Sequence, residues 1–360
     1  MVSDVTPAFV MDNVNIYARA YEETASKKSE QLNFTAVTAI MLDETPLTQN
    51  DDLKSQATPT ATFEPEMILP TSSFYQKTKQ DLRHLVSSIV LENMHVKKTV
   101  RAALARSKRS HDTKQLPVAK THYYPGRTLD LDESKTNDMM EIKGQLLVDC
   151  GPDPMSMDGK ALFLCGDHMT THRIRAAKME RKGSEMGPWE SSAEKWAETF
   201  SWAETVPGIF HLQMKVLACI FKVNWAQCAQ IGSLKRLTYN ILKMHNVNGN
   251  AKEFYPARDL LYSAGKAHAV SQMCRALKLY TPETLCNHSE QKVKTAIDAI
   301  VDEIMPSAQS KDLDGRSKLM RDNLLFRLFS DAIHAGEIGK VLEFMRYYTV
   351  CLLGYEGSQN

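Results

Sequence analysis

The sequence predicts a helix-rich α/β protein, with a few strands early in the chain and a large helical part after them. Short apolar runs that contain β-branched residues and end on acids are typical of strands. From Thr171 onward, apolar residues recur three and four positions apart, which is typical of helices packed on one side. A chain of 360 residues with 43% apolar and 24% charged residues can bury a core of this kind.

Two strands are predicted near the N-terminus. Residues 6–17 read TPAFVMDNVNIY, and we expect the apolar strand in this segment to end at Asp12 and Asn13. Residues 33–42 read NFTAVTAIML, in which apolar and β-branched residues alternate approximately until Asp43. Both strands are therefore expected to carry acids where they end.

An insertion is predicted after these strands. Residues 45–73 are rich in Thr and Pro, and their apolar residues follow neither the helical nor the strand period. So long a loop inside a compact domain usually marks an insertion. Residues 77–94 then predict a core-facing helix with an apolar stripe of Leu82, Leu85, Val86, Ile89 and Val90. Residues 97–127 carry nine Lys or Arg against one Asp, so they either follow a phosphate backbone or form a solvated segment.

A third strand is predicted where residues 161–171 read ALFLCGDHMTT. The apolar run before Gly166 alternates little, which suits a short strand buried on both faces. The composition of residues 171–182 predicts a helix after it, so Asp167 either caps this helix or serves a functional site at the strand end.

The remainder of the chain predicts amphipathic helices. Pro256 suits the first turn of one helix, and Gly336 stops another. The predicted helices are residues 209–227, 256–280, 292–305, 321–336 and 339–353. We therefore divide the chain into the first strands of the core (1–44), the insertion (45–160), and a core strand with a helical region (161–360).

Three acids stand in positions that suit a metal site: Asp12 and Asp167 at strand ends, and Glu337 at a helix start. Phosphoryl-transfer nucleases hold two divalent cations about 3.5–4 Å apart. Carboxylates are the hard oxygen donors that Mg²⁺ prefers. With 43 Asp and Glu in the chain, however, some strands end on acids by chance, and each of the three has a structural alternative.

A histidine and a basic helix accompany these acids. His211 follows a Pro-Gly pair and could act as a base, a phosphate contact or a metal ligand, or could be a partly buried structural residue. The basic residues on the helix after Asp167 are candidates for nucleic-acid binding, with an ordinary solvated helix face as the alternative. They are Arg173, Arg175, Lys178, Arg181 and Lys182.

Several classes of protein are not favoured by the sequence. Its seven cysteines form no C-x-x-C pair, which indicates buried thiols in a reducing compartment and argues against a zinc finger, although Cys286 and His288 are close together. There is no secretory leader and no apolar run of about 18 residues, so we expect an intracellular protein without a membrane span. Motifs of nucleotide loops, dinucleotide-binding folds, esterases and zincins are absent.

Four segments in order resemble the domain-of-unknown-function family 6589, a transposon-associated family of fungal and invertebrate genomes. They are FVMDNVNIY at 9–17, FLCGDHMTTHRIRAAK at 163–178, VPGIFHLQMKV at 206–216, and LFSDAIHAGEIGKVLEFM at 328–345 with LLGYEGSQN at 352–360. They are similar to the family's DN-x-N, GDQLT-x-x-R, pGdFH and GD-x-G segments. The sequence departs from this pattern at His168 (glutamine in the family), Ile209 (an acid) and Glu337 (aspartate).

The resemblance implies a divergent ribonuclease-H-like core related to DDE-type transposases. Under it, Asp12, Asp167 and Glu337 would bind Mg²⁺ or Mn²⁺, and His211 would support the site or touch phosphate. It further implies a DNA substrate, which favours the nucleus over the cytoplasm, and a chain truncated at both ends. The oligomeric state is left open.

Two functions are thus expected from the sequence. The first is a divergent DDE-type nuclease or transposase that acts on DNA phosphodiesters with Mg²⁺. The alternative is a catalytically inactive transposase relic that binds nucleic acid or protein.

Overall fold

A computed structural model describes most of the chain. The described residues are 7–18, 30–41, 69–111, 114–116, 122–150, 162–183, 199–225, 233–282, 285, 288–306 and 315–357. The irregular excursion predicted over 45–73 falls almost wholly outside them. Among the described residues the protein is a helix-rich α/β structure with a five-stranded mixed sheet.

The strands form one sheet in the order β3-β2-β1-β4-β5. Neighbours β1 and β2 run antiparallel, as do β2 and β3, whereas β4 is parallel to both β1 and β5. The strands are β1 (Pro7–Ala18), β2 (Glu30–Met41), β3 (His122–Leu129), β4 (Leu162–Gly166) and β5 (Ala203–Pro207). The carboxyl ends of the parallel strands β4 and β5 therefore lie on the same side of the sheet. The end of β4 lies beside the middle of its neighbour β1.

Strand β1 is longer than the sequence predicts. It does not end at Asp12 and Asn13 but continues to Ala18, because it pairs with β2 along its whole length, from Pro7 opposite Met41 to Ala18 opposite Glu30. Its parallel pairing with β4, in contrast, is recorded only from Ala8 to Val10. Asp12 thus lies inside a strand, just beyond its parallel segment.

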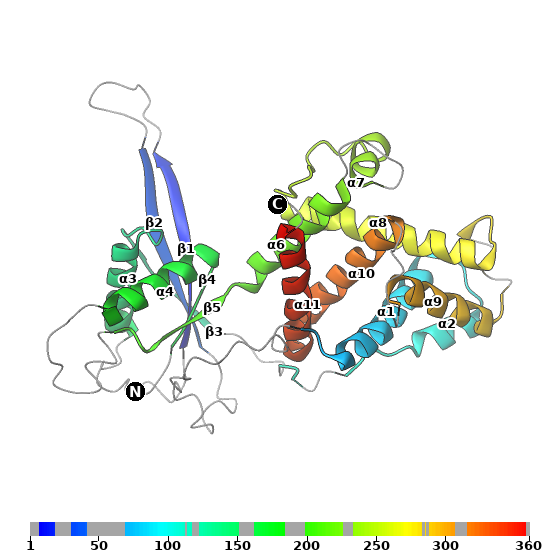
Figure 1. Ribbon diagram of the computed structural model, residues 1–360, viewed down its shortest axis with the longest axis horizontal. Helices are drawn as coiled ribbons and strands as arrows, with labels where there is room; N and C mark the ends of the chain where they lie inside the picture. The colour runs from blue at the N-terminus through cyan, green and yellow to red at the C-terminus, as the bar shows by residue number, and fades with distance from the viewer. Residues whose placement is uncertain are drawn as a thin grey trace. The chain divides into compact units, whose positions relative to one another are not determined.

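Two helices cover one face of the sheet, α3 (Thr136–Cys150) and α4 (His168–Gly183) (Figure 1). The core beneath them contains side chains from the strands, from both helices and from the segment before β5, including Phe9, Leu164, Ile142, Ile174 and Trp202. Along β4, burial alternates: Leu162, Leu164 and Gly166 are buried, while Phe163 and Cys165 are only partly covered. One face of this strand packs into the core, not both as expected.

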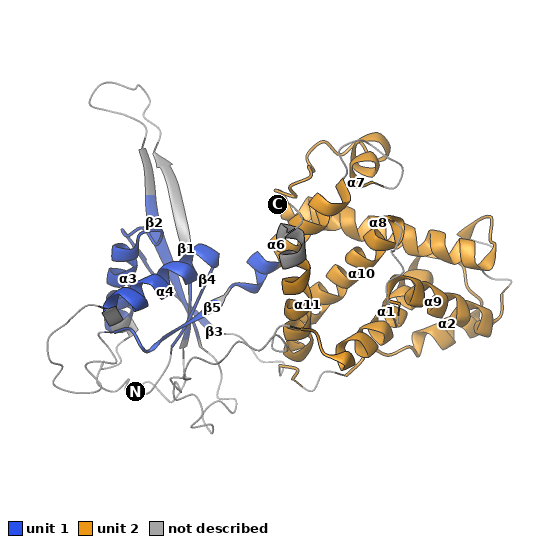
Figure 2. Ribbon diagram, in the orientation of Figure 1, with its two compact units in different colours: residues 1–62, 118–212 blue, residues 63–117, 213–360 orange. Residues whose placement is uncertain are grey.

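The chain forms two compact units (Figure 2). The sheet unit comprises residues 1–62 and 118–212, and the helical unit comprises residues 63–117 and 213–360. Of the predicted insertion 45–160, β3 and α3 belong to the sheet unit and α1 and α2 to the helical unit; the predicted division of the chain stays a prediction. The basic composition of residues 97–127 concealed the edge strand β3, most of whose side chains are exposed.

The helical unit contains the predicted amphipathic helices. Helix α1 buries all five residues of its predicted stripe and is capped by Thr71, whose hydroxyl accepts the Phe74 N–H. Its helices are α1 (Ser72–Asn93), α2 (Lys98–Ala105), most of α6 (Ile209–Trp225), α7 (Leu234–Arg236) with the π-helix η5 (Leu237–Ile241), α8 (Phe254–Leu277), α9 (Glu290–Ile304), α10 (Gly315–His334) and α11 (Ile338–Gly357). As predicted, Gly336 follows α10, with a positive φ of 67°.

Among the cysteines whose side chains the structure describes, four are free thiols. Cys165, Cys219 and Cys274 are partly buried and Cys351 is exposed. Cys286 of the weakly spaced zinc pair lies outside the described residues. No described helix is long and apolar enough to cross a membrane.

Candidate functional site

Strand pairing brings two of the predicted acids to one level of the sheet. The last recorded pair between the parallel strands β1 and β4 is Val10 with Cys165. Asp12 and Asp167 each follow two residues after their member of this pair. Ligand sites of open sheets lie at such carboxyl ends of parallel strands, where backbone supports the side chains and the edge stays accessible.

Asp167 caps helix α4. Its Oδ1 accepts the Thr170 N–H at 2.7 Å and lies 2.9 Å from the Thr170 Oγ1. Burial opposes ionisation of this carboxyl, but the hydrogen bonds from Thr170 and the nearby His211 outweigh it, so the pKa of Asp167 is lowered. The side chain is therefore a fixed carboxylate at neutral pH.

A third carboxylate, that of Glu133, joins this pair. Glu133 lies in the turn between β3 and α3 and is only 3% exposed. The Thr170 Oγ1 is 3.0 Å from its Oε1, so this one hydroxyl lies within hydrogen-bond distance of both Glu133 and Asp167. A hydroxyl has one proton to donate, and it can therefore satisfy only one of the two carboxylates at a time.

The surroundings of Glu133 do not compensate the negative charge of its carboxylate. Its Oε2 is buried and has no hydrogen-bond partner among the described residues. Burial, together with the negative charges of Asp167, Asp12 and Asp132, outweighs the hydrogen bond from Thr170 and raises the pKa of Glu133 to about 7. A proton or a bound cation would supply the missing interaction.

Glu133 has no feature in the sequence that marks it as a site residue. It stands in an acidic stretch before a helix, where acids are common because they complement the helix dipole. Its burial and its contact with Thr170, which is 37 positions further along the chain, distinguish it from Asp130 and Asp132 nearby.

Two glycines allow the strand ends to approach one another. The Gly208 N–H donates to the Gly166 carbonyl at 2.8 Å. A Cβ atom on Gly208 would lie 3.2 Å from the Gly166 oxygen and 3.3 Å from the His211 Nδ1. Gly208 therefore lets the first turn of α6 lie beside the end of β4.

His211 is exposed in the first turn of α6. It is close enough to Asp167 to lower the pKa of that carboxyl. The imidazole is thus placed at the same sheet edge as the acids, with its ring open to solvent.

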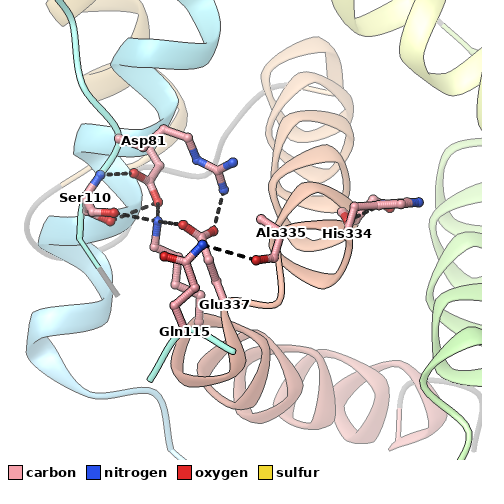
Figure 3. Close-up of polar contacts among 9 residues, drawn as sticks. Asp81, Ser110, Gln115, His334, Ala335 and Glu337 are labelled. Carbon is pink, nitrogen blue, oxygen red and sulfur yellow. Dashed lines mark hydrogen bonds and ion pairs between the residues drawn. The ribbon is translucent and has the colours of Figure 1, made fainter. Parts of the chain in front are cut away.

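Glu337 occupies different surroundings, in the helical unit (Figure 3). Its Oε2 accepts from the Arg109 Nη2 at 2.7 Å and its Oε1 from the Lys340 Nζ at 3.2 Å. Lys340 also lies 3.0 Å from Asp81, whose carboxylate accepts both the N–H and the hydroxyl of Ser110. This buried network joins α1 to the start of α11 and satisfies both carboxylate oxygens of Glu337. These contacts leave the metal-binding role predicted for Glu337 untested.

The basic residues of α4 contact β5 and the segment before it. The Lys178 Nζ donates to the Ala203 carbonyl and pairs with the Glu204 carboxylate, each at 3.0 Å. The Arg175 Nε donates to the Thr205 hydroxyl at 3.1 Å. The Arg181 guanidinium lies 5.5 Å from the centre of the Phe200 ring. Arg173 lies on the same helix, and the side chain of Lys182 falls outside what the structure describes. These contacts favour a structural role for part of the set; nucleic-acid binding stays a prediction.

The sheet edge suits a divalent cation by donor type and charge. Its carboxylates are hard oxygen donors, and the unpartnered Glu133 oxygen marks a place for positive charge. Across the part of the chain that the structure describes, however, no three His, Cys, Asp or Glu side chains are already grouped closely enough to hold one metal ion. Metal binding would therefore require these side chains to move.

Comparison with known proteins gives a family and no individual relative. No curated protein and no solved structure matches the chain. The family of unknown function DUF6589 matches residues 58–360, a range that contains β3, β4, β5 and the helical unit but not β1 and β2. Because this match covers most of the sequence, the chain belongs to the DUF6589 family.

Proposed function

We propose that the sheet unit is a divergent DDE-type nuclease or transposase that acts on DNA phosphodiesters with Mg²⁺ or Mn²⁺. The observation that carries the proposal is the buried, unpartnered Glu133 oxygen beside Asp167. Uncompensated carboxylates are costly in a protein interior unless a proton or cation offsets them.

The arrangement of the sheet supports a ribonuclease-H-like core. The sheet is mixed and five-stranded, with β4 and β5 parallel to β1 and with α3 and α4 on one face. This arrangement is compatible with the fold that the family resemblance implies. It also explains why acids from separate strands lie at one edge.

We assign the metal ligands to Asp12, Asp167 and Glu133. Glu133 takes the third position in place of Glu337, because Arg109 and Lys340 already neutralise Glu337. When bound, a divalent ion would stabilise charge on the phosphate and make an attacking water more acidic.

The remaining residues hold and orient the site. Thr170 fixes the Asp167 carboxylate through its N–H and shares its hydroxyl with Glu133. His211 is exposed and close to Asp167, and we assign it to contact a phosphate oxygen or to move a proton. A DNA partner and a nuclear location follow from this assignment.

The proposal is tested by Asp167→Asn, assayed for Mg²⁺-dependent cleavage or strand transfer on DNA. Asparagine also caps helices well, so this change removes the charge while α4 keeps its cap. We expect the Asp167 variant to lose the activity completely. Glu141→Gln, which removes an exposed carboxylate of the same unit, is the matched control and should retain it. Full activity of the Asp167 variant would refute the assignment.

A second candidate is a catalytically inactive transposase relic that binds nucleic acid or protein. The absence of a preformed three-ligand group among the described residues favours it. This candidate predicts DNA binding that is equally strong in Mg²⁺ and in EDTA, no cleavage, and no stabilisation of the wild-type chain by Mg²⁺.

A further inference from the structure

The helical unit contains a cavity that is separate from the carboxylates of the sheet. It has a volume of about 360 Å³ and is lined by residues of α7, η5, α8 and α10. Cavities of this size accommodate small-molecule ligands. None of its lining residues belongs to the proposed catalytic site, so the inference below does not depend on that proposal.

Three arginines from three helices converge on this cavity: Arg236, Arg275 and Arg316. Among the lining residues that the structure describes there is no Asp or Glu. Three guanidinium groups around one space repel each other, although the exposure of Arg275 and Arg316 to water screens this repulsion. A bound anion would turn this repulsion into attraction.

The arginines are largely available for such an anion. Arg236 and Arg316 form no ion pair with any described residue, and Arg275 meets Glu303 only at 3.4 Å. The guanidinium group is always charged and presents a planar fork of donors that matches a phosphate group. Ser233, Ser271 and Gln272 add neutral polar groups to the same lining.

His268 adds an unsatisfied polar atom to this lining. Its Nδ1 is buried and has no hydrogen-bond partner among the described residues. Burial lowers the pKa of His268, and the positive charge of Arg316 lowers it further, so the ring is neutral at neutral pH. A neutral imidazole offers one donor and one acceptor to a ligand that reaches it.

The rest of the lining is apolar and includes an irregular helix. Leu237 and Ile241 belong to the π-helix η5, and Leu319 and Met320 come from α10. Single π-helical turns are rare and are frequent at functional sites. The cavity therefore combines a cationic part with an apolar part, which suits a ligand that has a phosphate at one end and a flat or apolar body.

We propose that this cavity binds the phosphate of a nucleotide, with the arginines on the phosphate and the apolar residues against the base or sugar. The nucleotide is either a free mononucleotide or the phosphorylated end of a nucleic-acid strand. Both sources present the same phosphate monoester chemistry.

The test measures binding of four probes to the full chain by calorimetry and thermal melting. The probes are inorganic phosphate, adenosine 5′-monophosphate, adenosine, and a short single-stranded oligodeoxynucleotide with a 5′-phosphate. We expect at least one phosphate probe to bind, and adenosine to bind at least about tenfold more weakly than its monophosphate. Whichever of the mononucleotide and the oligonucleotide binds with the higher affinity identifies the source of the phosphate.

The decisive variant is Arg236→Gln with Arg316→Gln, and its matched control is Lys318→Gln, an exposed cation on α10 outside the lining. The double variant should lose about tenfold or more in affinity for the phosphate probe, and the control should bind as the wild type does. Each single variant, checked by circular dichroism, should show part of the loss, which keeps the test valid if the double variant unfolds. Absence of binding by every phosphate probe, or unchanged affinity in folded arginine variants, would overturn the proposal.

Discussion

At the residue scale, two side chains of the sheet unit are buried in charge states that their surroundings disfavour. Glu133 is a buried acid beside other acids, and its pKa is raised to about 7. Lys143 is a fully buried base, and burial, then the charge of Lys178, lowers its pKa to about 7. Both groups link the stability of the sheet unit to pH, in opposite directions.

For Glu133, the linkage makes the folded protein less stable as pH rises. The folded pKa lies above the ordinary value of 4.5, so stability is fully present below about pH 4.5 and is lost as pH passes through about 7. Glu133→Gln removes this loss and should stabilise the protein at pH 8 in EDTA by up to about 3 kcal/mol. Thermal melting at pH 5 and pH 8 measures the difference.

The same variant tests the metal assignment. Mg²⁺ should raise the melting temperature of the wild type at pH 8, because a ligand that binds only the folded state stabilises it. The Glu133→Gln variant should show little of this shift. An equal shift in both proteins would exclude Glu133 as a ligand.

For Lys143, the change of stability with pH has the opposite sign. The folded pKa lies below the ordinary value of 10.5, so stability increases as pH rises from about 7 to about 10.5. Its Nζ donates to the Ile174 carbonyl at 3.2 Å and lies 4.4 Å from the centre of the Phe200 ring, which offsets only part of the cost of burial. Lys143→Met should stabilise the protein by about 1–4 kcal/mol at pH 6, with a smaller gain at pH 10. Denaturant unfolding at the two pH values is the measurement, and a gain that grows with pH would contradict the argument.

At the element scale, the junction of β4 with α4 depends on close packing. A Cβ atom on Gly166 would lie 2.6 Å from the Thr170 Cγ2, so the first turn of α4 can follow the strand directly only if position 166 has no side chain. This approach also brings the Thr170 hydroxyl to Asp167 and Glu133. The same glycine thus shapes both the fold and the candidate site.

Gly166→Ala should therefore destabilise the protein by about 1–3 kcal/mol, as overpacking does elsewhere. The matched control is Gly144→Ala on the exposed side of α3, where an added Cβ meets nothing within 4 Å. Alanine there should stabilise by about 0.5–1 kcal/mol, because glycine is a poor helix former. Denaturant unfolding should show changes of opposite sign in the free energy of unfolding of the two variants. Changes of the same sign would show that the close packing at Gly166 does not require a residue without a side chain.

At the scale of the whole molecule, the two units place the predicted acids in different chemical settings. Asp12 and Asp167 belong to the sheet unit with Glu133, and Glu337 belongs to the helical unit with its own cations. The Glu337 network holds the segment after α2 against α1 and α11. We therefore expect Glu337 to contribute to stability without contributing to metal binding.

Substitutions in this network separate the two roles. Lys340→Met leaves two buried carboxylates without their shared cation and should cost about 3–5 kcal/mol in unfolding free energy. Glu337→Gln should cost less, about 1–3 kcal/mol, because its hydrogen bonds are weakened but not all lost. The Mg²⁺-dependent melting shift should be the same in Glu337→Gln as in the wild type. If Mg²⁺ no longer raised the melting temperature of Glu337→Gln, Glu337 would instead be a metal ligand.

Local patterns in the sequence predicted most of the long helices and the presence of the first two strands. The stripe of Leu82 to Val90 predicted α1 because the helical period is a property of neighbouring residues, and all five stripe residues are buried. The glycine and acid after the apolar run predicted the end of β4 for the same reason, and the cap on α4 was one of the two roles expected for Asp167. The edge strand β3 was missed, since an exposed edge has no apolar alternation to detect.

The sequence by itself determined a helix-rich α/β protein of the DUF6589 family with acids near its strand ends. Only the tertiary structure decided which acids meet: it added Glu133 to Asp167 through Thr170, and it gave Glu337 the cations Arg109 and Lys340 as partners. The physical reason is that a carboxylate's pKa and partners depend on burial and on charges contributed by distant parts of the chain, which no local period encodes.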